Sequence, residues 1–226
     1  MKKYIFQLLT LVLGITSCDS YTDIHQEYLE GGEIVYLQKV DSVVAHAGKE
    51  RIQFKLWYNN GDRLTKTVIF YNEYKDSIVI DLTNKLKSGK DSLDFMVDLP
   101  ETNYNFNVIN FNVFNQRSLA VPHFASSYGE MYQATLKNRL IKSSSKLSDG
   151  AGFQVEWYTP SESYAGMELE YNGSKGKEIV TIMDESEITI SELPTDNKFR
   201  YRTFFFPEET AIDSIPCEWS KDIVLE

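Results

Sequence analysis

Two cysteines and three histidines carry the most versatile side-chain chemistry in the chain, and they lie far apart in the sequence. Cys18 follows a short apolar segment, whereas Cys217 stands between Pro216 and Glu218 with no activating partner nearby. Two thiols allow one disulfide at most and supply too few ligands for a thiolate metal cluster. If Cys18 is modified, no internal disulfide is left and the fold must be stabilised by packing. We expect Cys217 to be a strand residue rather than a nucleophile.

The histidines and acidic residues form no catalytic or metal-binding motif. His25, His46 and His123 stand in separate segments, with no carboxylate or cysteine at ligand spacing. The chain also has no Gly-x-Ser-x-Gly elbow, phosphate-binding glycine loop or calcium loop. Neighbouring acids such as Asp184 and Glu185 are typical of solvated turns in a chain with 33 acidic residues. The sequence therefore predicts a protein that is not an enzyme and that holds no metal or cofactor.

Asparagines alternate with apolar side chains over residues 103–115. In a strand, Asn105 and Asn107 share one face while Tyr104 and Phe106 share the other. Amide groups hydrogen-bond to hydroxyls, and aromatic rings offer flat apolar surfaces, so this mixture can bind a sugar. The alternative is a plain polar strand face. We take Asn105 and Asn107 as the candidate glycan-binding face.

In two aromatic strands, the face that begins with polar side chains continues with apolar ones. These apolar residues are the candidate interface: Ile109, Phe111 and Val113 in the first strand, Phe204 and Phe206 in the second. Contiguous exposed apolar side chains usually mark a contact surface. The alternative is a β-bulge that reverses the register and turns these residues into the core. As a contact surface, they would serve first in packing between domains and second in docking a partner lipoprotein or transporter.

Period-two alternation along most of the chain predicts strands to position these residues. Ile52, Phe54 and Leu56 alternate with polar residues, and residues 93–99 repeat the pattern. Asn60 and Gly61 mark a tight turn that connects two strands. The sequence therefore predicts an all-β protein with half-buried strands.

The same order of segments occurs twice, which predicts two copies of one unit. Residues 54–58 match 155–158, and residues 69–72 match 169–172. A third match pairs residues 99–106 with residues 193–201. Each copy resembles an immunoglobulin or fibronectin type III β-sandwich. We expect two tandem sandwiches, over residues 33–122 and 126–226.

Leu99 and Pro100 precede Tyr104 in a pattern that resembles the tyrosine corner of such sandwiches. In the second copy Phe199 takes the place of the tyrosine and has no hydroxyl, so that copy departs from the pattern. The side-chain phase aligns Leu56 rather than Trp57 with Trp157. Trp57 is therefore expected to face outward or to sit at a bulge.

The N-terminus resembles the signal and lipobox of bacterial lipoproteins. Lys2 and Lys3 precede an apolar run over residues 4–13, and small residues lead to Cys18. The apolar run is too short to span a bilayer as a mature helix. The resemblance implies a signal peptide over residues 1–17, acylation of Cys18, and a polar tether over residues 18–32. The alternative is an ordinary secretory signal with a chance cysteine.

The formal charge excludes one class of partner. It is −10, and becomes −12 when cleavage removes Lys2 and Lys3 but no acid. An acidic chain repels the phosphates of nucleic acid, so no nucleic-acid partner is expected. The same charge argues against flat adhesion of the protein body to anionic lipid.

The wider sequence resembles a family of Bacteroidota lipoproteins known only as a domain of unknown function. The resemblance is carried by residues 23–36, 41–43, 128–132 and 138–140. It implies tandem sandwich domains, often beside outer-membrane glycan-uptake transporters of the starch-utilisation type. No functional residue follows from it.

Four aspartates precede serine and an aliphatic residue: Asp41, Asp76, Asp91 and Asp213. The pattern resembles the O-glycosylation sites of this bacterial group. Asp-Ser is also a common way to enter a strand from a turn, so both interpretations stay open.

Together these features predict a non-catalytic accessory protein that is lipid-anchored to the bacterial outer membrane and exposed at the cell surface. It would bind a glycan or dock onto a glycan-uptake complex. The alternative is a structural spacer or adhesin-like stalk without a ligand. A binder should show a concave surface of aromatic and amide groups, whereas a spacer should show evenly charged faces and a rigid domain junction.

Overall fold

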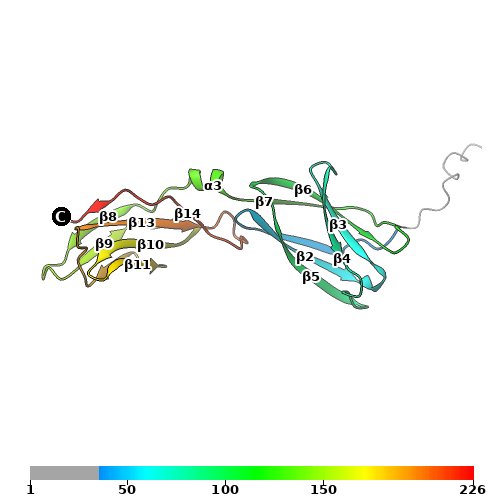
Figure 1. The fold of residues 1–226 in the computed structure, drawn as a ribbon, viewed down its shortest axis with the longest axis horizontal. Coiled ribbons are helices and arrows are strands. Elements are labelled where there is room, and N and C mark those ends of the chain that lie inside the picture. Colours follow the sequence, from blue (N-terminus) through cyan, green and yellow to red (C-terminus); the bar gives the residue numbers. More distant parts are fainter. Residues whose placement is uncertain (1–35) are drawn as a thin grey trace, which may run out of the picture.

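A computed structural model of the protein describes residues 36–226. Two β-sandwiches lie end to end, with the first described residues at one end of the molecule and the C-terminus at the other (Figure 1). The expected signal peptide over residues 1–17, the acylation site Cys18 and the tether over residues 18–32 lie outside the described residues.

The first sandwich consists of two antiparallel sheets. One sheet has the strand order β1-β2-β5, with β1 Ser42–Ala47, β2 Arg51–Asn59 and β5 Lys90–Asp98. The other has the order β4-β3-β6-β7, with β4 Asp76–Asp81, β3 Lys66–Tyr71, β6 Thr102–Phe111 and β7 Val121–Ser127. A 3-10 turn, η2 (Gly61–Arg63), leads from β2 to β3.

The second sandwich repeats this plan after a short helix, α3 (Glu130–Thr135). One sheet has the order β12-β9-β8, with β12 Glu187–Ile190, β9 Phe153–Trp157 and β8 Ile141–Lys146. The other has the order β11-β10-β13-β14, with β11 Gly176–Ile182, β10 Tyr164–Gly173, β13 Lys198–Phe205 and β14 Ile215–Pro216. A final strand, β15 (Ile223–Val224), also pairs with β13.

The matching strand orders confirm the prediction of two tandem fibronectin type III-like sandwiches, because each copy sends its first, second and fifth strands to one sheet. The end of the first sandwich differs from the expected boundary at residue 122. Strand β7 pairs with β6 as far as the partners Thr102 and Ser127, so the first sheet continues five residues further.

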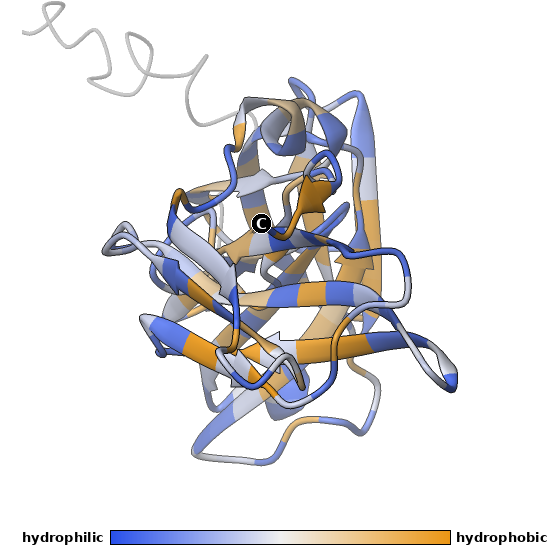
Figure 2. Ribbon diagram, turned by 90° about the vertical axis from the view of Figure 1, so that its left-hand side faces the viewer, coloured by the Kyte–Doolittle hydropathy of each residue, from blue (hydrophilic) through white to orange (hydrophobic). Residues whose placement is uncertain are grey.

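Strand β2 shows how alternation builds the first core. Ile52, Phe54 and Leu56 are buried, whereas Trp57 lies half-buried on the outer face. The register from β2 to β5 runs without a shift, so Trp57 faces outward through phase alone and not through a bulge. Hydrophobic and hydrophilic residues alternate in the same way along the strands of the second sandwich that face the viewer in Figure 2.

The second core is centred on Trp157, whose ring is 2% exposed. It packs with Phe153, Phe199 and Tyr201 in a cluster separate from the core of the first sandwich. The Trp157 Nε1 group has no hydrogen-bond partner among the described residues. The stability of this ring therefore comes from apolar packing alone.

The corner between β5 and β6 has the hydrogen bond that the sequence predicts. The Tyr104 hydroxyl donates to the Pro100 carbonyl over 2.8 Å. In the second copy Phe199 is buried but lacks a hydroxyl, and the corner is held instead by the Thr195 amide, which donates to the Asn172 carbonyl over 2.8 Å.

The two sandwiches are joined by an ion pair as well as by the chain. Asp213, in the loop between β13 and β14, accepts from the Arg51 guanidinium at both carboxylate oxygens, over 2.5 and 2.8 Å. It also accepts from the Lys49 amide over 2.8 Å, and the Ile212 amide donates to the Ala47 carbonyl over 2.8 Å. The loop of the second sandwich thus holds the β1–β2 turn of the first.

Candidate functional site

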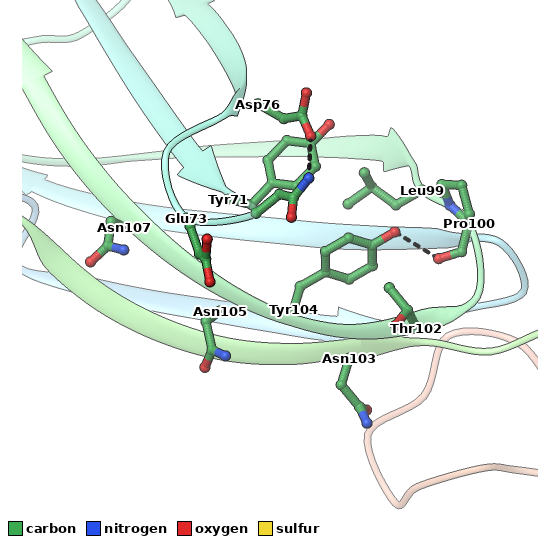
Figure 3. A pocket seen from close by; sticks show the side chains of 11 residues that line it. Tyr71, Glu73, Asp76, Leu99, Pro100, Thr102, Asn103, Tyr104, Asn105 and Asn107 are labelled. Carbon is green, nitrogen blue, oxygen red and sulfur yellow. Dashed lines mark hydrogen bonds between the residues drawn. The ribbon is translucent and has the colours of Figure 1, made fainter.

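A hollow of about 770 Å³ opens at one end of the β4-β3-β6-β7 sheet. Its walls come from the β3–β4 turn, the β5–β6 corner and the first half of β6 (Figure 3). These segments are brought together because β3 and β6 are paired neighbours and the corner leads directly into β6. The lining residues are Tyr71, Asn72, Glu73, Asp76, Leu99, Pro100, Thr102, Asn103, Tyr104, Asn105 and Asn107.

Strand β6 divides its side chains between the core and the hollow. Tyr104 and Phe106 are buried in the first core, while Asn103 and Asn105 are exposed and Asn107 is half-buried on the other face. The side chains of Asn105 and Asn107 have no hydrogen-bond partner within residues 36–226, whereas the Asn103 carbonyl oxygen accepts from the Ser126 hydroxyl over 2.7 Å. Two amides are therefore available to a ligand.

Aromatic rings form the floor of the hollow. The Tyr71 and Tyr104 rings meet edge to face with centroids 5.7 Å apart, and Tyr104 stacks on Phe106 at 5.4 Å. Burial raises the pKa of the Tyr104 hydroxyl, which stays protonated and keeps donating to Pro100. Both rings line the hollow, but Tyr104 is buried, so the apolar surface beside the polar side chains of β6 comes mainly from the half-buried Tyr71 ring.

The β3–β4 turn has an uncommon backbone conformation. Asn72, Glu73 and Tyr74 have φ values of 50°, 56° and 65°, all in the left-handed region. Asparagine adopts this region readily, but glutamate and tyrosine do so at a cost of about 1 to 2 kcal/mol each. The turn is closed by the Asn72 amide, which donates to the Asp76 carboxylate over 2.9 Å. The strain sets the Glu73 carboxylate at the rim of the hollow (Figure 3).

A second hollow of about 230 Å³ adjoins the first on the β6–β7 side. Asn105 and Asn107 line both hollows, so these two amides form the ridge between them. Phe124 pairs with Asn105 across the strands and is 60% exposed. An exposed ring thus lies beside the two amides, as a sugar-binding face requires.

The groups at this ridge can hold a polar ligand but are not arranged for proton transfer or metal binding. Within residues 36–226, no three His, Cys, Asp or Glu side chains come close enough to hold a metal ion. His123, beside the second hollow, has its pKa lowered by burial, so its ring is uncharged at neutral pH. Elsewhere, burial raises the pKa of the Cys217 thiol to about 11, which keeps it protonated and unreactive.

The three candidate interface residues of the first sandwich differ in how far their side chains are exposed to solvent. Ile109 lies on the outer face yet is only 6% exposed, because it pairs with the equally buried Val68 of β3. Phe111 is half-buried beneath the Lys66 ammonium, 5.2 Å from the ring centroid. Val113 is exposed in the loop after β6. No register shift occurs in the β3–β6 ladder, so the bulge alternative is wrong for this strand.

The second group lies on the outer face of β13. Phe205 points inward and is buried, whereas Phe204 is half-buried and Phe206 is 38% exposed. The ladder with β10 shifts between Tyr164 and Gly166, but this irregularity lies on β10 and leaves the alternation of β13 intact. The hydrogen bonds across the domain junction come from other residues, in the loop that follows Phe206.

The outer face of the second sandwich is chemically different from that of the first. Arg200 pairs with Glu170 and Arg202 with Glu168, each over 2.7 Å. The Trp219 ring covers both guanidinium groups, at 5.0 and 4.6 Å. The polar groups here already have partners, whereas the amides at the equivalent positions of β6 do not.

Sequence reasoning identified Asn105 and Asn107 but missed Tyr71, Glu73, Asp76 and Phe124. The turn from Asn72 to Asp76 contains no glycine, the residue that usually indicates a left-handed backbone in a sequence. Phe124 could have been found from the alternation of β7, where it takes the outward position beside buried Ala125.

Comparisons with known proteins identify a family for this chain. A family model described as a domain of unknown function matches residues 18–215. No curated protein matches the chain. The description of the family names no activity.

Two solved structures similar to this chain contain fibronectin type III domains. The FN1–FN3 domains of chicken CNTN1 have 15% sequence identity and a TM-score of 0.38, over 84% of this chain and 67% of that one. A two-domain fibronectin type III segment of chicken tenascin has 9% identity and a TM-score of 0.35, over 83% of this chain and 99% of that one.

Proposed function

The chain belongs to DUF4998, a family described as a domain of unknown function, and we propose that it is a non-catalytic accessory protein that binds a glycan at the ridge of Asn105 and Asn107. The observation that carries this proposal is the position of both amides between two hollows, beside the exposed Phe124 ring. Amides supply directional hydrogen bonds to hydroxyls, and the ring supplies a flat apolar surface.

The rim of carboxylates favours a neutral or basic glycan over an acidic one. Glu73 and Asp76 stand at the hollow, and no basic side chain lines it. A uronic acid or sulfated sugar would meet like charge there, which costs binding free energy. We therefore place neutral oligosaccharides first among the ligands.

Attachment to the bacterial outer membrane is the second part of the proposal. Its support is the sequence that leads to Cys18, with acylation as the means of anchorage. Within residues 36–226, no helix has the length and apolar character needed to cross a bilayer. An outer-membrane transporter or another lipoprotein of a glycan-uptake system is the proposed partner.

A structural spacer is the second candidate function, and the domain junction favours it. Asp213 joins both sandwiches through the Arg51 guanidinium and the Lys49 amide. Such a clamp resists bending between the domains. The two functions are compatible, because a stiff stalk can also present a binding site.

A glycan array tests the binding proposal with the full chain and with the double variant Asn105→Ala, Asn107→Ala. The matched control is Gln53→Ala, which removes an exposed amide from the outer face of the opposite sheet. We expect neutral oligosaccharides to bind the unmodified chain and the control, and the double variant to lose at least about tenfold in affinity, or about 1.4 kcal/mol. Equal binding by all three proteins, or no binding to any glycan, would contradict the proposal and leave the spacer.

A further inference from the structure

One end of the first sandwich is formed by four segments, which we call the distal pole: residues 36–41, 59–66, 81–91 and 111–120. Backbone hydrogen bonds tie them together, including those from the Thr65 amide to the Phe111 carbonyl, 2.9 Å, and from the Leu82 amide to the Thr65 carbonyl, 2.8 Å. The first described residues join the same pole, since the Leu37 amide donates to the Arg117 carbonyl over 3.1 Å. The pole lies at the end away from the second sandwich (Figure 1).

Four large hydrophobic side chains of the pole are exposed, and besides Tyr36 and Leu119 they include two neighbours in one loop. Phe114 is 81% exposed and Val113 is 72% exposed, in the loop that follows β6. The loop is ordered by Asn112, whose side-chain oxygen accepts from the Phe114 amide over 3.0 Å and from the Gln116 amide over 3.1 Å. The apolar tip is therefore held outward by its own turn and cannot fold back onto the sandwich without breaking these bonds.

The pole is also the basic end of an acidic chain. Its four segments contain seven basic and four acidic residues, whereas the whole chain has a formal charge of −10. Six of the basic side chains are exposed. Lys85 and Lys87 lie in the loop between β4 and β5, and Lys90 is the first residue of β5. The negative charge of the whole chain argues against adhesion to anionic lipid, but the net charge of the pole is positive.

We propose that the distal pole docks onto an anionic lipid surface, with Val113 and Phe114 in the interface and the lysines over the headgroups. An exposed apolar tip surrounded by basic side chains is the combination that binds such surfaces. Tyr36, the first described residue, belongs to this same pole, so the proposed anchor at Cys18 is joined to the molecule here, 18 residues earlier in the sequence. The inference is separate from glycan binding and adds a second contact to the proposed lipid anchorage.

The test places an environment-sensitive nitrobenzoxadiazole fluorophore at Val113→Cys in the full chain, which keeps Phe114 in place. The matched control is Ser174→Cys, an exposed position in the β10–β11 turn of the other sandwich. The unsubstituted chain, treated with the same reagent, gives the background from Cys18, while Cys217 is buried. The proteins are reconstituted on vesicles of phosphatidylcholine alone and of an equal mixture with phosphatidylglycerol.

We expect a blue shift and a rise in emission at position 113 on the phosphatidylglycerol vesicles and no shift at position 174. Salt at about 1 M, where the Debye length falls to about 3 Å, should reverse much of the effect. If the emission at position 113 on the anionic vesicles stays the same as in water, the proposal is overturned. A blue shift that grows with protein concentration without vesicles would also overturn it, because it indicates contact between two copies of the chain.

Reversing the charge of two lysines in the pole distinguishes membrane contact by the pole from attachment through the lipid anchor. Lys85→Glu with Lys87→Glu should abolish the blue shift at position 113 while the protein still floats with the vesicles. The control Lys175→Glu, in the same turn as Ser174, should leave the shift unchanged. If the lysine variants keep the full blue shift, the electrostatic contact is wrong. Loss of vesicle attachment in Cys18→Ala alone would bear on the anchor and not on the pole.

Discussion

Tyr104 stands at the corner between β5 and β6, whereas Phe199, which the sequence aligns with it, lies opposite Tyr171 in its own sheet. The Tyr104 hydroxyl spans four residues to reach Pro100 and so fixes the corner from which the candidate site begins. Phe199 has no hydroxyl, and the corner of the second sandwich is closed by the Thr195 amide, which donates to the Asn172 carbonyl.

We predict that Tyr104→Phe lowers the free energy of unfolding by about 1 kcal/mol, the net worth of one hydrogen bond. The ring still packs against Tyr71 and Phe106, so the fold should persist. Urea unfolding monitored by fluorescence measures the change. Tyr158→Phe is the control, because that ring is 55% exposed and its loss of a hydroxyl should have no effect. Equal effects of both changes would show that the corner bond adds nothing.

The two strand tryptophans should differ sharply in their contribution to stability. Trp157→Ala is expected to cost about 3 to 5 kcal/mol, because the ring is fully packed in the second core. Trp57→Ala should cost no more than about 1 kcal/mol, since it removes a half-buried ring and a contact with the Lys55 ammonium at 5.2 Å. Chemical unfolding of the two variants decides, and similar costs would contradict the assigned faces.

At the scale of the element, the end of β13 also places a buried side chain next to an exposed one. Phe205→Ala should destabilise the second sandwich by about 3 to 5 kcal/mol, because the side chain is buried. Phe206→Ala should change stability by no more than about 1 kcal/mol, since its ring is on the outer face. Thermal unfolding of the full chain measures both. If Phe206→Ala collapses the transition, the outer face is part of the core and the orientation is wrong.

Much of the architecture could be predicted at this scale because strand periodicity is a local property. The alternation of Ile52, Phe54 and Leu56 identified a core face, and the phase of the repeat correctly turned Trp57 away from it. Leucine, proline and tyrosine at the right spacing identified the corner. Each of these features depends on residues within one strand or one turn.

The remainder depends on partners that the sequence does not place side by side. Ile109 alternates as an outward residue, but pairing with Val68 buries it, and that pairing is known only once the sheet order is fixed. The sequence left Asp213 as part of an O-glycosylation pattern or as the start of a strand, and neither interpretation predicts that its carboxylate binds Arg51, which lies 162 residues earlier in the chain. Four of the eleven residues that line the larger hollow, from Tyr71 to Asp76, were missed for the same reason.

At the scale of the whole molecule, the junction should respond to acid. The Arg51 guanidinium hydrogen-bonds to Asp213 and lowers the pKa of that carboxyl below its ordinary value of 3.8, and the Lys49 amide adds to the effect. A lowered pKa in the closed junction means that the carboxylate stabilises it fully above about pH 4. This stabilisation is lost as the pH falls through the lowered pKa. Asp98 adds a second negative charge near Arg51.

Single-molecule energy transfer between labels at Val113→Cys and Ser174→Cys, one on each sandwich, can measure this response. We expect a narrow distance distribution at pH 7 that broadens in acid, and a broad distribution at both pH values for Asp213→Asn. Asp196→Asn is the control, since that carboxylate binds Asn172 within the second sandwich. A distribution for Asp213→Asn as narrow as that of the unsubstituted chain would show that other contacts hold the junction.

The clamp at Asp213 also has a consequence for the order of assembly. Every strand of the first sandwich precedes residue 128, so this domain can fold while the rest of the chain is still being delivered. Asp213, which holds the junction, comes much later, in the loop after β13. A chain synthesised only as far as residue 212 would therefore carry a complete first domain on a loose hinge, and the junction stiffens only once this loop has been made.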